Sequence, residues 1–166
     1  MKRTKNPAKE AEYRKRAADL VAQMTLHEKV SQMLSWAPAI ERLGIPAYNW
    51  WSEGIHGVGR AGTATVFPQA IGMAAAFDED MMEQVGNAIG VEARGKYNMC
   101  RAHGDRDIFK GLTVWAPNIN IFRDPRWGRG HETYGEDPFL TSRLGVRFVE
   151  GMQGDDTDYL QAAACA

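Results

Sequence analysis

The segment Leu112-Thr-Val-Trp-Ala-Pro-Asn-Ile-Asn-Ile-Phe122 is followed directly by Arg123-Asp-Pro-Arg-Trp-Gly-Arg-Gly-His-Glu-Thr-Tyr-Gly-Glu-Asp137. The first part is nearly continuously apolar, as buried parallel strands are, although Pro117 predicts an interruption. The second part is highly charged, and its glycines and Pro125 exclude a long helix or a central strand. Because unpaired charges are costly to bury, we expect a shaped polar loop. Loops of this kind on rigid scaffolds are where ligands are usually held.

The chain on either side of this segment alternates between predicted helices and short strands. Asp137 and Pro138 predict the start of a helix that Gly154 ends, and Asp78 predicts the cap of another helix over 79–98. Helical spacing also covers 7–35, with a capping box at 25–28 that predicts a break. We expect three further strands, at 47–51, at 65–67 and from 159 to the end of the chain.

This order of strands, loops and helices predicts an α/β fold with a parallel sheet. The last predicted strand is still running at Ala166, and a complete (β/α)₈ barrel typically needs roughly 250 residues. We therefore expect residues 1–166 to be part of one domain, a partial (β/α)₈ TIM barrel made of the first few βα units only.

Composition places the chain among ordinary globular proteins, with 44% apolar and 25% charged residues. A net charge of −1 gives no reason to expect nucleic acid or an anionic membrane as a partner. No apolar region follows the basic N-terminus, so we expect neither a signal peptide nor a membrane span. Cys100 and Cys165 have no metal-ligand spacing, and they favour a reducing compartment, with the cytoplasm as the default.

Two polar loops follow predicted strands, which is where a barrel carries its functional groups. Glu53 and His56 follow the first of these strands, and Arg129 lies in the second loop. The aromatic ring of Trp51 next to the Glu53 carboxylate suits a sugar, because sugars offer C–H faces for stacking and hydroxyls for hydrogen bonds. Arg129 has the donors to bind sugar hydroxyls or to hold an acidic partner.

Structural roles are an alternative for several of these residues. Asp124 and Arg126 alternate in sign and can simply pair to hold the loop, and Asp137 can serve as a helix cap. His56 can be a histidine packed beneath its loop, and Trp115 by composition alone belongs in a core. The histidines have no tight ligand spacing, and the glycine-rich stretch 54–62 does not match a phosphate-binding pattern, so we expect no metal and no cofactor.

Four ordered motifs stand out in the chain: Tyr-Asn-Trp-Trp-Ser-Glu-Gly-Ile-His-Gly-Val (48–58), Thr-Val-Phe-Pro-Gln-Ala-Ile-Gly-Met-Ala (65–74), Ala-Pro-Asn-Ile-Asn-Ile-Phe-Arg-Asp-Pro-Arg-Trp-Gly-Arg (116–129) and Glu-Thr-Tyr-Gly-Glu-Asp-Pro (132–138). Together they resemble glycoside hydrolase family 3, in particular its β-xylosidase and β-glucosidase members. The resemblance extends from about residue 17 to the end of the chain. It implies a retaining β-glycosidase whose catalytic domain is a (β/α)₈ barrel.

The resemblance also implies roles for individual residues. In the family, the positions of Glu53 and Arg129 hydrogen-bond hydroxyls of the sugar in the −1 subsite, and the position of Trp115 borders that subsite in xylosidase-like members. A Lys-His pair that also binds sugar follows the run that ends here at Ala166. The nucleophile, an aspartate, and the general acid/base come from later segments, so neither role is carried over to any residue of this chain.

These observations predict a chain that holds part of a glycone-binding site and is inactive alone. The parent reaction is the hydrolysis of terminal, non-reducing β-linked xylose or glucose, and the partners are a β-xyloside or β-glucoside and the remainder of the barrel. The alternative is a non-catalytic sugar-binding or half-barrel assembly module that associates with itself or with a partner chain, because an open half-barrel leaves sheet edges uncovered. Paired tryptophans and a glutamate at position 53 favour xylosidases, although the sequence does not decide between xylose, glucose and arabinose.

Overall fold

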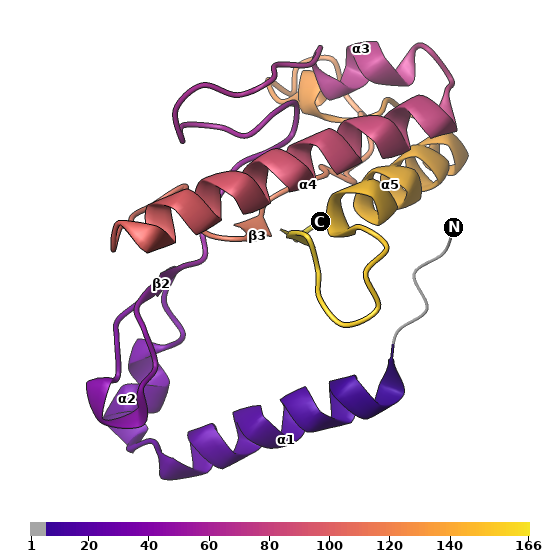
Figure 1. Cartoon of the computed structure of the whole chain (residues 1–166). Helices are drawn as coiled ribbons and strands as arrows, with labels where there is room; N and C mark the ends of the chain where they lie inside the picture. Colours follow the sequence, from indigo (N-terminus) through magenta and orange to yellow (C-terminus); the bar gives the residue numbers. More distant parts are fainter. Residues whose placement is uncertain (1–5) are drawn as a thin grey trace.

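The computed structural model describes residues 6–166, and Figure 1 shows that two long helices, α4 and α5, lie side by side at its centre. Helix α4 spans Glu79–Ala102 and α5 spans Pro138–Gln153. Helix α3 (Ala70–Ala74) lies over one end of α4, whereas α1 (Pro7–Gln23) runs apart from this pair.

Helices α4 and α5 form the core because each buries one apolar face. Met82 and Ile89 of α4 and Leu144 and Phe148 of α5 are at most 1% exposed. Glycines allow the two backbones to approach closely: a side chain on Gly86 would overlap the Phe148 backbone. The core therefore depends on small residues at the helix crossing as much as on large apolar ones.

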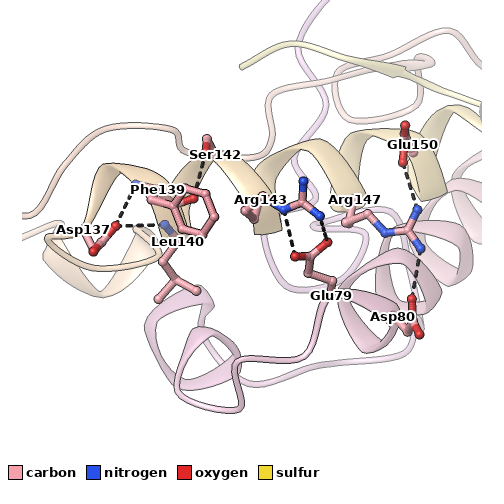
Figure 2. A network of polar contacts seen from close by, with 9 residues as sticks. All are labelled: Glu79, Asp80, Asp137, Phe139, Leu140, Ser142, Arg143, Arg147 and Glu150. Atoms are coloured by element: carbon pink, nitrogen blue, oxygen red, sulfur yellow. Dashed lines mark hydrogen bonds and ion pairs between the residues drawn. The ribbon is translucent and has the colours of Figure 1, made fainter.

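Charged side chains join the same two helices at their surface. Arg143 donates to both carboxylate oxygens of Glu79, at 2.8 and 2.9 Å. Arg147 lies among three carboxylates: it pairs with Asp80 and Glu150 at 3.0 Å (Figure 2), and it also pairs with Glu83. Because most of these groups are partly exposed, they fix the relative position of the helices more than they stabilise them.

Three short segments form a parallel arrangement beside the helices. Ser52 bridges Val114, and β3 (Thr113–Val114) pairs in parallel with β4 (Ala163–Ala164). Helix α4 lies between the first and second of these segments in the chain, and α5 between the second and third. Each of these segments is therefore separated from the next in the chain by a long helix.

The N-terminal part of the chain packs differently from the rest. Thr25 and Glu28 form the predicted capping box, so the helical region divides into α1 and α2 (Leu26–Ser31). The predicted apolar face of α1 is not part of the core, because neither α1 nor α2 contains a buried residue. At its start, α1 contacts the 155–160 loop through a hydrogen bond of 3.3 Å from Asn6 to Asp158.

Several predicted strands are shorter than expected or absent. The 47–51 strand reduces to β2 (Tyr48–Asn49), which pairs antiparallel with an unpredicted β1 (Trp36–Ala37), and 65–67 forms no strand. The 112–122 run leaves the sheet after Val114, before a cis Ala116–Pro117 bond, and the final strand is limited to β4. Short 3₁₀ helices form at Glu41–Leu43 (η1) and Gly130–Glu132 (η2), and they and α3 were not predicted.

The helices follow the sequence prediction more closely. Asp78 accepts a hydrogen bond of 2.9 Å from the Met81 amide, and α4 runs one turn beyond the expected end. Gly154 ends α5 as predicted. No helix within residues 6–166 is long and apolar enough to cross a membrane. The basic N-terminus considered for a signal peptide lies mostly outside the described residues.

Candidate sugar-binding site

Two tryptophans and a carboxylate meet at one end of the parallel segments. The rings of Trp51 and Trp115 are stacked, with centroids 4.7 Å apart and an interplanar angle of 14°. The two residues remain 37% and 42% exposed. The Trp51 indole Nε1–H donates to Oε1 of Glu53 at 3.2 Å, so the carboxylate lies directly beside the aromatic surface.

The strand pairing explains why residues so far apart in sequence meet here. Trp115 donates its backbone N–H to the Ser52 carbonyl at 2.8 Å, next to the Ser52–Val114 bridge. Parallel segments end at the same edge, so the residues that follow them become neighbours. Trp115 therefore lies at the surface rather than in the core, contrary to its composition-based alternative.

His56 is occupied by contacts within its own loop. Its Nδ1 lies 3.0 Å from the Phe67 carbonyl, and its Nε2 lies 3.4 Å from the Gln69 side-chain amide. The Phe67 amide returns a hydrogen bond of 2.9 Å to the His56 carbonyl. His56 thus ties the glycine-rich loop to the segment that precedes α3, and its position agrees with the structural alternative.

Arg129 lies in the second polar loop and forms a bidentate pair with Glu132. Its Nε donates to Oε1 at 3.0 Å and its Nη2 to Oε2 at 2.6 Å. The hydrogen bonds from Arg129 lower the pKa of the Glu132 carboxyl, against the opposing effect of desolvation. Among residues 6–166, Arg129 makes no hydrogen bond or ion pair with Glu53. The two residues predicted to bind sugar hydroxyls are therefore not paired with one another.

The second polar loop is folded around a buried centre. Gly130 and Thr133 are buried, and the Thr133 hydroxyl donates to the Gly130 carbonyl at 2.7 Å. The Phe122 ring covers Gly130 so closely that a side chain there would overlap it. Tyr134 is also buried, and burial raises the pKa of its phenol. This centre gives the exposed Arg129 a rigid base.

Other charged residues of this loop have the structural roles that were considered. Asp124 accepts hydrogen bonds from the Arg126 backbone and side chain, at 2.9 Å from both the amide nitrogen and Nε. Asp137 caps α5 by accepting from the Phe139 and Leu140 amides at 2.6 and 2.9 Å (Figure 2). These two carboxylates hold the backbone of the loop.

The structure therefore brings together Trp51, Trp115 and Glu53, and it places His56 and Arg129 in separate contacts. Arg60 and Phe109 were not predicted to belong to the site. The Arg60 Nε lies 3.8 Å from Oε2 of Glu53, and the Phe109 ring lies beneath the Arg60 guanidinium. Gly59 and Gly62, on either side of Arg60, are a weak indication of an unusual backbone conformation in the sequence, whereas no residue near Phe109 gives such an indication. Within residues 6–166, no group of three or more His, Cys, Asp or Glu side chains is arranged to hold a metal.

An exposed aromatic pair beside a carboxylate provides a stacking face and a hydrogen-bond acceptor at one place. A sugar needs both, because its C–H faces pack against aromatic rings while its hydroxyls require polar partners. The site is an open surface, so it contacts one side of such a ligand only.

The chain is similar in sequence to known glycosidases. Residues 16–163 match the model of the glycosyl hydrolase family 3 N terminal domain. The chain is 51% identical to probable beta-D-xylosidase 7 of Arabidopsis thaliana over 91% of its own length and 21% of that protein. It is 49% identical to a xylan 1,4-beta-xylosidase of Xylanibacter ruminicola over 92% of its own length and 18% of that protein.

Solved structures of two glycosidases have a similar fold. A family 3 exo-beta-xylosidase, XlnD, in complex with a xylobiose aziridine probe matches 90% of the chain and 20% of its own length, with a TM-score of 0.80 and 37% identity. The beta-glucosidase DesR of Streptomyces venezuelae, in complex with D-glucose, matches 84% of the chain and 18% of its own length, with a TM-score of 0.67 and 33% identity.

The chain spans about a fifth of the length of the relatives it matches. The N-terminal domain of this family has a TIM-barrel-type fold, to which the helix-rich structure corresponds in part. With a family model covering residues 16–163 and relatives at about half identity, the chain belongs to glycosyl hydrolase family 3.

Proposed function

We propose that this chain supplies one wall of the glycone-binding site of a retaining β-glycosidase. The parent reaction is the hydrolysis of terminal, non-reducing β-linked xylose or glucose. The stacked Trp51–Trp115 pair beside Glu53 is the observation that carries this proposal. Relatives named as xylosidases and a structural neighbour that holds a xylobiose-derived probe favour xylose as the sugar.

Each residue of the proposed site has a role that its chemistry allows. The uncovered face of one indole of the stacked Trp51–Trp115 pair packs against the sugar ring, and the Glu53 carboxylate accepts hydrogen bonds from two hydroxyls. Arg129 donates from Nη1, which pairs with no group among residues 6–166 whereas Nε and Nη2 bind Glu132. His56 remains a proposed contact, and a role in ligand binding requires one of its present hydrogen bonds to be exchanged.

We further propose that the catalytic carboxyl groups come from outside the chain and that the chain is inactive alone. Retaining hydrolysis needs two carboxyl groups about 5 Å apart, on either side of the glycosidic bond. Glu53 binds Trp51 and Glu132 binds Arg129, each within its own loop, and we assign neither carboxylate to this pair. The parallel segments 52, 113–114 and 163–164 support the first βα units of a barrel whose remainder would complete the site.

Sugar binding can be tested on the chain itself. We expect methyl β-xyloside and xylobiose to shift the indole N–H resonances of Trp51 and Trp115 at millimolar concentrations, in line with a site that is only part of a pocket. Glu53→Ala should abolish the shifts, and Glu41→Ala, which removes an exposed carboxylate from η1, should leave them intact. If the resonance shifts persist in Glu53→Ala, Glu53 does not contribute to sugar binding.

Catalysis needs a separate assay, with nitrophenyl β-xyloside as the substrate. We expect no turnover by the purified chain above the rate of the uncatalysed reaction. Turnover that Glu53→Ala abolishes would contradict the proposed inactivity, because it would show that the chain holds a complete active site.

The second candidate function is a half-barrel assembly module that needs a partner chain or a second copy. It is favoured by the exposed apolar side chains of residues 26–36: Leu26, Val30, Met33, Leu34 and Trp36 are between 45% and 84% exposed. Such groups usually mark a surface that another part of a protein covers.

The two free cysteines, Cys100 and Cys165, agree with the proposed cytoplasmic location.

A further inference from the structure

Two non-glycine residues next to the candidate site have an uncommon backbone conformation. Arg60 has a φ of 57° and Phe109 a φ of 67°, both in the left-handed region that glycine favours. They lie far apart in the sequence but contact one another, with the Arg60 guanidinium carbon 5.3 Å from the centroid of the Phe109 ring. Strained residues persist only where the surrounding structure holds them, and they concentrate at functional sites.

Both residues are connected to Glu53 or to the tryptophan beside it. Arg60 Nε lies 3.8 Å from Oε2 of Glu53, on the oxygen that Trp51 does not occupy. The Phe109 amide donates to the Trp51 carbonyl at 2.8 Å, and the Gly59 amide donates to the Glu53 carbonyl at 2.9 Å. The Glu53 side chain is thus held from two sides, by the indole on one oxygen and by the guanidinium on the other.

The loop that carries Arg60 is fixed from the helix behind it. Lys96 of α4 donates to the Ala61 and Thr63 carbonyls at 2.9 and 2.5 Å. Glu92, one turn earlier on α4, accepts from the Thr65 amide at 3.0 Å. Because α4 is packed in the core, these contacts fix the position of the backbone at Arg60.

Stability alone does not explain this arrangement. The side chains of Arg60 and Glu53 are 71% and 43% exposed, and exposed ion pairs add little to stability. The left-handed φ at Arg60 is unfavourable for any residue with a side chain, so glycine would be the better choice for folding. An arginine here is therefore explained by what its side chain does at Glu53.

We propose that Arg60, supported on the Phe109 ring, is a positioning residue that orients the Glu53 carboxylate for the sugar hydroxyls. This inference rests on the proposed sugar-binding function. The carboxylate is flexible on its own, and a fixed orientation removes ordering that the ligand would otherwise have to impose.

The test uses Arg60→Gly, which removes the guanidinium and suits the left-handed backbone. The readout is the Trp51 indole N–H, which donates to Glu53 and reports the carboxylate orientation without any sugar present. We expect the resonance to move and its exchange with solvent to quicken about threefold to tenfold, with no fall in Tm. Xylobiose affinity should fall about threefold to tenfold, and Arg60→Lys should restore part of it.

Two further variants keep the result interpretable. Phe109→Leu removes the aromatic support and should move the same resonance in the same direction. Arg126→Gly is the matched control, because Arg126 is also an exposed loop arginine paired with a carboxylate. It should leave the Trp51 signal unchanged.

The outcomes separate this inference from the proposed function. An unchanged Trp51 resonance in Arg60→Gly overturns the positioning role, and so does a loss of Tm that accompanies the change, because it would show a structural role. A Trp51 resonance that responds to Arg60→Gly in a chain that does not bind xylobiose supports the positioning of Glu53 and overturns the sugar-binding function.

Discussion

At the residue scale, the two polar loops hold their charged groups in different ways. Glu53 is held by groups from its own loop and strand end, whereas Arg129 is held by Glu132, three positions along the chain. A ligand hydroxyl can approach Glu53 without breaking its hydrogen bond to Trp51, because a carboxylate has about four acceptor sites. Arg129 has its Nη1 donors to offer, because Glu132 binds Nε and Nη2.

Gly130 gives a sharp test of how the second polar loop is built. We expect Gly130→Ala to destabilise the fold by about 1–3 kcal/mol, because the new methyl group would overlap the Phe122 ring. Gly128→Ala in the same loop is the control, since nothing lies within 4 Å of a side chain there, and its effect should stay within about 0.5 kcal/mol. Urea unfolding monitored by tryptophan fluorescence measures both, and equal effects would contradict the described packing.

We expect the contacts of Glu28 at the junction of α1 and α2 to depend on pH. Hydrogen bonds from Arg42 and from the Thr25 backbone lower the pKa of its carboxyl from 4.5 to about 2. A lowered pKa in the folded state stabilises the junction above pH 4.5, and this contribution is lost as the pH falls toward about 2. We expect NMR titration of the Glu28 carboxyl carbon to show this low pKa, and Arg42→Ala to return it toward the ordinary value. An unchanged midpoint in Arg42→Ala would rule out the pair as its cause.

At the element scale, the effect of replacing a glycine of α4 on stability depends on the helix face that the glycine occupies. Gly86 faces α5, where a side chain would overlap the Phe148 backbone, so Gly86→Ala should destabilise the protein by about 1–3 kcal/mol. Gly95 lies on the exposed face with nothing within 4 Å, so Gly95→Ala should stabilise it by about 0.5–1 kcal/mol through helix propensity. Thermal unfolding followed by circular dichroism should show opposite shifts of Tm, and shifts of the same sign would disprove the α4–α5 packing.

The elements also differ in how well the sequence predicted them. Both long helices were predicted because Asp78 and Asp137 give capping signals and Gly154 gives a stop signal, and all three are local features. The strands were overpredicted, since pairing depends on a partner that local sequence does not contain. Residues 65–67 show this directly: they are apolar enough for a strand, yet Phe67 pairs with His56 of the neighbouring loop instead.

At the scale of the whole molecule, α1 lies apart from the core (Figure 1). At the start of α1, Asn6 bonds Asp158 and the rings of Tyr13 and Tyr159 lie 6.5 Å apart. At the other end of α1, the apolar side chains of residues 26–36 are exposed. This surface is where we expect further protein to pack.

Self-association follows from that exposed surface. We expect light scattering to show a mass that rises with protein concentration, and Leu26→Gln combined with Met33→Gln to reduce the rise, because these side chains are 79% and 84% exposed. Val91→Gln on α4 is the control, since it removes a 53% exposed apolar side chain elsewhere. A well-folded monomer at every concentration would count against the assembly function.

The residues proposed to bind sugar were named from the sequence, whereas their relative positions come from the structure. Glu53, Trp51 and Trp115 were identified in advance, and the structure places them in contact. Arg60 and Phe109 were missed because their importance comes from a contact between distant loops.

The sequence by itself determined the family, the two long helices, their caps and the polar character of both loops. These properties follow from motif order, side-chain chemistry and hydrogen bonds between residues close in the chain. Only the tertiary structure decided that Trp115 stacks on Trp51, that His56 is occupied by Phe67 and Gln69, and that Arg60 reaches Glu53. Those contacts depend on parallel segments ending at one edge and on α4 fixing the loop behind them, and neither arrangement is encoded by residues near in sequence.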